Sequence, residues 1–160
     1  MAICLATVRA RHLAERVTMV KERLVTGGCL CGAVRFECRH QPFHVCYCHC
    51  GMCRRNVGSV VSAWAFFPET ELKFTKGQPT WYKSSETVSR GFCSACGSPI
   101  GFSNTEYEHI CIAHGALDNQ GSFPPQKQWY FEDKLPFLDL QIDLENISSL
   151  PEARRTNPDS

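Results

Sequence analysis

Short segments in which apolar and polar residues alternate recur along most of the chain. Residues 33–38 (AVRFEC) and 87–92 (TVSRGF) have the two-residue period of strands with one buried face. Residues 59–67 (SVVSAWAFF) are β-branched and aromatic, which favours a strand closed by Pro68. Further strands are predicted at residues 43–48, 72–74, 80–83, 99–102 and 109–113. Helical periodicity is confined to one predicted turn at 52–56, so the pattern predicts an all-β fold.

The pattern also predicts where the domain begins and ends. One domain is expected over residues 22–145, and a Pro- and aromatic-rich segment at 123–137 is predicted to be a loop packed against it. Residues 1–21 are predicted to be a disordered N-terminal extension or a non-native start. Their arginines give them a faint resemblance to an organelle transit peptide, which is the less favoured interpretation. Residues 146–160 form a predicted polar tail.

Composition and charge narrow the class of protein. The chain has 160 residues, enough for one domain with a core, and its 43% hydrophobic and 21% charged content is ordinary for a globular protein. The net charge of +1 gives no strong field for nucleic acid or an anionic membrane. No apolar run approaches the ~20 residues of a membrane span. We therefore expect neither a membrane nor a nucleic-acid partner.

Cysteine is the unusual residue, with eleven copies. A small secreted domain held by disulfides would also be rich in cysteine. However, the cysteines cluster as Cys-x-Cys and Cys-x-x-Cys pairs, and no secretory signal is evident. These features favour metal-bound thiolates in a reducing compartment, so we expect a cytoplasmic protein.

The densest cluster lies in residues 46–55 (CYCHCGMCRR). Thiolates this close repel one another, and a soft divalent ion, zinc above all, compensates their charge. On an extended chain the side chains of Cys48 and Cys50 would lie roughly 6.6 Å apart, at ~3.3 Å per residue. That is too far for one tetrahedral ion, so the chain must bend, and Gly51 permits the bend. Cys53 follows after the spacer that is typical of a zinc knuckle.

Two metal sites are predicted from these cysteines. Cys29, Cys31, Cys93 and Cys96 supply the four thiolates of a closed structural zinc site that would tie an early strand to a late one. A redox-active pair is the alternative for Cys93 and Cys96, but no thioredoxin-like pattern surrounds them.

The second predicted site consists of Cys48, Cys50 and Cys53, with its fourth ligand open. Cys46 is on the same strand face and would close a second structural site; otherwise water or substrate takes the fourth position. His49 is predicted to point away, either behind the ligands or exposed. The other cysteines are predicted to be ordinary thiols: Cys4, Cys38 and Cys111.

Three cysteine motifs occur in order at residues 27–36 (GGCLCGAVRF), 48–54 (CHCGMCR) and 92–98 (FCSACGS). In this order and spacing they resemble the glutathione-dependent formaldehyde-activating enzyme (GFA) family, whose domain also occurs in centromere protein V. The resemblance extends from about Thr26 to Asp143. It implies a β-tent fold of short antiparallel sheets built around zinc knuckles and two Zn²⁺ per chain. The implied structural ligands are Cys29, Cys31, Cys93 and Cys96, and the implied functional ligands are Cys48, Cys50 and Cys53.

The second site suggests a reaction. Three thiolates leave zinc a weak Lewis acid that still binds and exchanges a soft thiol, which suits the addition of a thiol to an aldehyde or the reverse cleavage. The resemblance implies formation of S-hydroxymethylglutathione from glutathione and formaldehyde. We therefore predict a zinc-dependent carbon–sulfur lyase or thiol-adduct enzyme acting on a glutathione conjugate. The alternative is a non-catalytic, zinc-stabilised binding module.

Substrate contacts are less determined by the sequence. Arg54 and Arg55 are predicted to bind the carboxylates of a glutathione-like substrate, with a solvated basic turn as the alternative for either. Three histidines are candidates to carry the proton by residue type alone: His44, His49 and His114. Three aromatic residues are predicted to lie in the core and not in a pocket: Trp64, Phe66 and Phe67.

Overall fold

The computed structural model describes residues 24–140 and 145–147, which form two β-sheets and one α-helix. The predicted extension at residues 1–21 and most of the predicted tail lie outside these ranges. The three-stranded sheet has the order β1 (Val25–Gly28), β2 (Arg35–Cys38), β5 (Leu72–Lys76). The eight-stranded sheet has the order β11 (Glu145–Ile147), β10 (Lys127–Trp129), β3 (His44–Cys48), β4 (Ser62–Pro68), β9 (His109–Ala113), β8 (Pro99–Asn104), β7 (Val88–Phe92), β6 (Thr80–Lys83).

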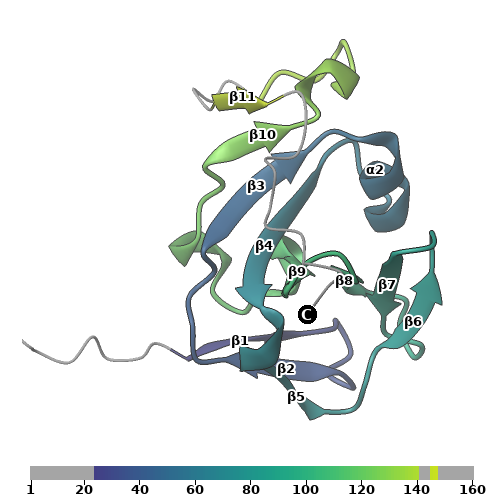
Figure 1. Ribbon diagram of the computed structural model, residues 1–160, viewed down its shortest axis with the longest axis vertical. Helices are drawn as coiled ribbons and strands as arrows, with labels where there is room; N and C mark the ends of the chain where they lie inside the picture. Colours follow the sequence, from purple (N-terminus) through teal and green to yellow (C-terminus); the bar gives the residue numbers. More distant parts are fainter. Residues whose placement is uncertain (1–23, 141–144, 148–160) are drawn as a thin grey trace, which may run out of the picture.

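The large sheet curves from β11 at the top of Figure 1 through β4 to β6 at the right, and the small sheet lies below it. Helix α2 (Gly51–Val57) connects β3 to β4, and short 3-10 turns occur at Glu69–Glu71, His114–Ala116, Gln120–Ser122 and Phe131–Asp133. No helix in the described ranges is both long and apolar enough to cross a membrane. The predicted all-β class is confirmed.

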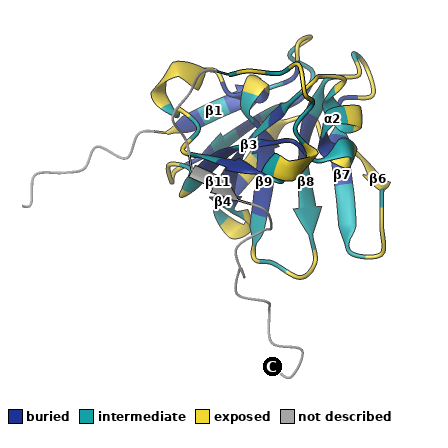
Figure 2. Cartoon of the chain, turned by 90° about the horizontal axis from the view of Figure 1, so that it is seen from above, coloured by how far each residue is buried: buried dark blue, intermediate teal, exposed yellow. Residues whose placement is uncertain are grey.

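Strand β4 is the centre of the core because it lies between β3 and β9. Its aromatic residues Trp64, Phe66 and Phe67 are buried, as their apolar character predicts. Figure 2 shows the buried residues (dark blue) gathered in β3 and β9 as well. The strand begins at Ser62 and not at the predicted position 59, because residues 58–61 still form the turn that leaves α2.

Helix α2 forms where the sequence required a bend. The thiol of Cys50 caps its N-terminus by accepting a hydrogen bond from the backbone N–H of Cys53 at 3.3 Å. The helix ends at Gly58, whose backbone N–H donates to the carbonyl oxygen of Arg54. The predicted single turn is therefore a seven-residue helix.

The sheets are mostly antiparallel, as predicted, and strand β10 is the exception. This strand pairs in parallel with β3 on one side and with β11 on the other. It lies inside the segment 123–137 that was predicted to be a loop, since three residues are too few to show an alternation. Strand β11 spans the predicted end of the domain at residue 145.

The packing of β8 against β9 leaves no room for a side chain at Gly101. A Cβ atom there would overlap the carbonyl oxygen of Cys111. We expect Gly101→Ala to lower the free energy of unfolding by about 1–3 kcal/mol, because a backbone oxygen cannot rotate away as a side chain can. Gly121→Ala is the matched control, since a Cβ there meets open space. Equal urea midpoints for the two variants would contradict this prediction.

Candidate metal centres and an adjoining cavity

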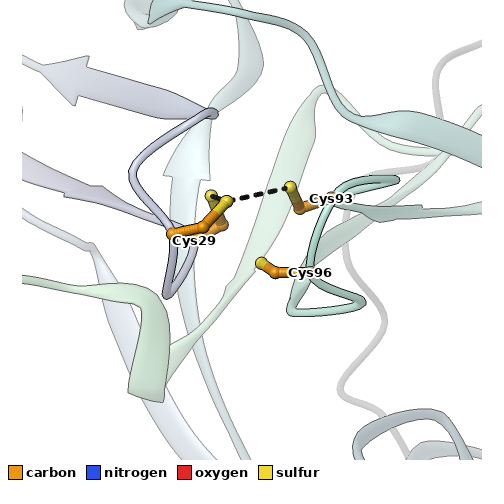
Figure 3. A group of neighbouring side chains, drawn as sticks. Cys29, Cys93 and Cys96 are labelled. Atoms are coloured by element: carbon orange, nitrogen blue, oxygen red, sulfur yellow. Dashed lines mark hydrogen bonds between the residues drawn. The ribbon is translucent and has the colours of Figure 1, made fainter.

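Two loops bring four thiols together. Cys29 and Cys31 follow β1, and Cys93 and Cys96 follow β7; their Sγ atoms all lie within 4.8 Å of one another. Figure 3 shows Cys93 and Cys96 facing Cys29 from the opposite loop. The Sγ atoms of Cys29 and Cys31 are 3.5 Å apart, and those of Cys31 and Cys93 are 3.9 Å apart. Sulfurs around a tetrahedral zinc ion are about 3.8 Å apart when Zn–S is ~2.3 Å. The group therefore fits one metal ion.

A glycine ends each of these cysteine turns. Gly32 and Gly97 have φ of 70° and 75°, a region that residues with a Cβ rarely occupy. Their backbone N–H groups donate to the carbonyl oxygens of Cys29 and Cys93 at 3.1 and 2.8 Å. A glycine follows each cysteine pair because the turn that directs both sulfurs towards the metal-binding group needs this backbone conformation.

Ser98 joins the two loops next to this group. Its hydroxyl lies 3.2 Å from Sγ of Cys96 and accepts a hydrogen bond from the backbone N–H of Leu30 at 3.1 Å. Hydrogen bonding from Ser98 lowers the pKa of Cys96 to about 5. The thiolate form, which a metal requires, is therefore favoured at neutral pH. The sequence reasoning assigned no role to Ser98, although it stands directly in the third cysteine motif.

The second group consists of three thiols held by adjacent elements. Cys48 ends β3, Cys50 caps α2 and Cys53 lies in its first turn; their Sγ atoms lie within 4.8 Å of one another. Hydrogen bonds with Cys48 and Cys53 lower the pKa of Cys50 to about 2, and the one with Cys50 raises the pKa of Cys48. Cys50 is therefore the thiol of this group that loses its proton most readily.

Cys46 does not complete this group. It lies on the same face of β3 as Cys48 but is fully buried, and the group that can hold a metal does not include it. Burial raises the pKa of the Cys46 thiol, which favours its protonated form. No described His, Cys, Asp or Glu side chain provides a fourth ligand to the three thiols.

His49 is fully buried, which excludes one of the two predicted alternatives, exposure to solvent. Its Nε2 atom donates to Oε1 of Gln128 at 3.0 Å, and its ring packs edge-on against Phe131. The strand pairing explains this burial, because β10 and the turn after it cover the residue that follows β3.

A cavity of about 370 Å³ adjoins the second group, and all three of its cysteines contribute to the wall. Most of the remaining wall is aromatic. Trp64 and Phe66 belong to it, so they are pocket residues as well as core residues, whereas Phe67 does not line it. Other rings in the wall include Phe43, Phe102, Tyr107, His109 and Trp129.

The comparison with known families identifies the family of the chain. The model of the glutathione-dependent formaldehyde-activating enzyme family matches residues 24–133, which contain both cysteine groups. The chain belongs to this family. A Rhodobacter sphaeroides protein of known crystal structure is similar, with a TM-score of 0.47 and 19% identity, covering 76% of this chain and 98% of that one. No curated protein matches the chain. The resemblance inferred from the cysteine motifs is confirmed.

In this GFA-family chain the two predicted arginines lie outside the cavity. Arg54 and Arg55 line a separate depression along α2, together with residues 58–60. Both guanidinium groups nevertheless lie close to Gly51, the first residue of the helix. Measured from the position that a Cβ atom would take on Gly51, Nη1 of Arg55 is 3.2 Å away and Nη2 of Arg54 is 3.9 Å away. Gly51 follows Cys50 directly, so the two cations lie near the second cysteine group. Their role in substrate binding stays a prediction.

Of the three candidate histidines, only His44 lines the cavity of this family member. Its ring stacks on Trp129, with centroids 5.0 Å apart and planes 22° apart. Burial lowers the pKa of His44, so the neutral ring predominates at pH 7. His114 instead donates from Nε2 to the carbonyl oxygen of Phe123 at 2.8 Å. His109, which the sequence reasoning did not select, also lines the cavity and stacks on Tyr107.

Sequence reasoning missed both charged residues of the GFA-domain cavity, Lys127 and the buried Arg90. Arg90 is 8% exposed and lies over the ring of Phe102, with Cζ 5.3 Å from the centroid. Its Nε atom donates to the hydroxyl of Ser84 at 3.2 Å, and Nη2 lies 3.7 Å from Sδ of Met52. The sequence could have revealed Arg90, because the alternation of β7 places it on the same strand face as the apolar Val88. An arginine at such a position needs a reason to be buried.

Proposed function

We propose that the protein is a zinc-dependent carbon–sulfur lyase or thiol-adduct enzyme that acts on a glutathione conjugate. Joining glutathione to formaldehyde as S-hydroxymethylglutathione is the reaction that the family description suggests. The proposal depends on the group Cys48, Cys50 and Cys53. These three cysteines line a cavity, and no described residue provides them with a fourth ligand. A closed structural site would not need a cavity.

The donor atoms fit zinc at both places. Both groups consist entirely of sulfur, which favours zinc over harder ions such as Mg²⁺ or Ca²⁺. In this proposal the structural zinc is held by Cys29, Cys31, Cys93 and Cys96, and the functional zinc by Cys48, Cys50 and Cys53. Bound to three thiolates, zinc supplies a position at which an incoming thiol is held as thiolate and exchanged.

The side chains around the second group supply the remaining functions. Aromatic walls exclude water from the side on which the sulfur must react. His44 has an Nε2 atom with no hydrogen-bond partner among the described residues, so this atom is available to pass a proton to or from the substrate oxygen. Arg54 and Arg55, beside the start of α2, bind the carboxylates of the glutathione part, which remains outside the apolar cavity.

A thiol titration tests this function. Glutathione added to zinc-replete protein is expected to bind, as measured by calorimetry, and S-methylglutathione is expected not to, because its sulfur cannot become a thiolate. Cys50→Ser should abolish the binding of glutathione. The proposal fails if glutathione does not bind, or if its affinity is the same for Cys50→Ser. Addition of formaldehyde should then yield S-hydroxymethylglutathione faster than in buffer, as measured by NMR.

A non-catalytic binding module is the second candidate. It requires Cys46 to close the second site, and the exclusion of Cys46 from the three-thiol group counts against it. The β-tent fold and a cytoplasmic location complete the proposal. The described cysteines are all free thiols, which suits a compartment that keeps them reduced.

A further inference from the structure

The cavity beside the second cysteine group is large for a one-carbon substrate. Its volume is about 370 Å³. Formaldehyde has two heavy atoms and occupies roughly 60 Å³ if each takes about the ~30 Å³ of a liquid water molecule. Cavities of ~300–1,000 Å³ usually enclose ligands of many heavy atoms. A body much larger than formaldehyde therefore fits this space.

The walls select an apolar, ring-bearing body. On one side Trp129, His44 and Phe66 pack together with ring centroids 5.0 to 5.4 Å apart. On the other side Trp64 and Phe102 meet edge to face at 4.9 Å. Flat rings of this kind stabilise a planar or apolar ligand. The ammonium and the peptide groups of glutathione would lack partners against these rings.

Apart from the three cysteines of the second group, the charged side chains of the cavity favour an anion. No aspartate or glutamate of the described chain lines it, whereas Arg90 and Lys127 do. Nη1 of Arg90 has no hydrogen-bond partner within the described part of the protein, and neither has Nε1 of Trp129. Both atoms are donors. A buried guanidinium group is stabilised when an anion accepts its free hydrogen bonds.

We propose that this cavity binds a substrate moiety with an aromatic or bulky apolar body and a carboxylate, the carboxylate being held by Arg90. We assign this moiety to the part of the conjugate other than glutathione, and this assignment rests on the proposed function. The binding of an aromatic acid in the cavity does not depend on the proposed function. A different role for Arg90, as the counter-charge of the Cys53 thiolate, is separated by the experiment below.

The test uses 2-naphthoate and its neutral amide, 2-naphthamide, as a matched pair of probes for zinc-replete protein. Calorimetry is expected to show naphthoate binding at least ten-fold more tightly than naphthamide. Arg90→Met should remove this preference, Arg90→Lys should retain part of it, and Arg39→Met, an exposed arginine outside the cavity, should leave it unchanged. Equal binding of the acid and the amide by the unmodified protein would overturn the inference, and this comparison requires no variant to fold.

Two further arms separate the possible failures. Naphthoate has no thiol, so its binding is expected to survive Cys50→Ser, whereas glutathione binding is lost. Naphthoate binding without glutathione binding would refute the proposed function and leave this inference standing; the reverse result would refute the inference alone. If Arg90→Met loses zinc but keeps the preference for the acid, Arg90 serves the cysteines and the inference is wrong.

Discussion

Cys93→Ser is expected to lower the melting temperature of the protein far more than the replacement of a buried thiol outside the metal-binding groups. The four-cysteine group connects the loop after β1 to the loop after β7, and its partners Cys31 and Cys93 are 62 residues apart in the sequence. A metal ion that joins such distant segments closes a long loop. This lowers the conformational entropy of the unfolded chain and so stabilises the folded protein. Apparent binding free energies of structural zinc, ~10–16 kcal/mol in zinc-finger peptides, are as large as the total stability of a domain, ~5–15 kcal/mol. Circular dichroism and zinc content measure the result.

Cys38→Ser is the matched control for this substitution. Cys38 is as fully buried as Cys93 but belongs to neither metal-binding group. Burying its new hydroxyl should cost about 1–3 kcal/mol and should leave the zinc content unchanged. If Cys93→Ser melts within a few degrees of Cys38→Ser, the four-cysteine group does not stabilise the fold.

Cys50→Ser is expected to lose one zinc ion per chain while the protein remains folded. Cys50 is one of the three thiols of the second group and accepts a hydrogen bond from the backbone N–H of Cys53, so two thiols remain after its removal. Two ligands hold zinc weakly. The fold survives because this group connects only β3 to the adjoining α2, and a short loop contributes little closure entropy. Elemental analysis of the purified variants gives the zinc content.

Cys46→Ser is the companion variant for this measurement. Its thiol is buried outside the group of three, so both zinc ions should be retained. If Cys46→Ser also lost one zinc ion, Cys46 would be a ligand and the second site would be closed.

The cysteine pairs could be predicted because their geometry is local, and the two distant pairs were joined because a closed zinc site needs four thiolates. Each pair is separated by one or two residues, and the glycine after it, such as Gly32 or Gly97, permits the turn that aims both sulfurs inward. The bend between β3 and α2 followed in the same way from the distance between Cys48 and Cys50 along an extended strand. Most strands were found because their alternation extends over four residues or more.

The cavity could not be predicted, because residues far apart in the sequence form it. Arg90 comes from β7, Trp129 from β10 and Phe66 from β4, and only the strand order of the large sheet places them on one face. Alternation tells which face of a strand is buried but not which strands surround it. Strand β10 itself is three residues long, below the length at which a period can be recognised.

The parallel pairing of β10 with β3 places Trp129 opposite Cys48. The strand adds a ring to the cavity wall but no sulfur to either metal-binding group. This part of the cavity wall and the thiols that can hold a metal therefore come from different segments of the chain. Substitutions in β10 can thus change the shape of the cavity wall without replacing any cysteine of the two metal-binding groups.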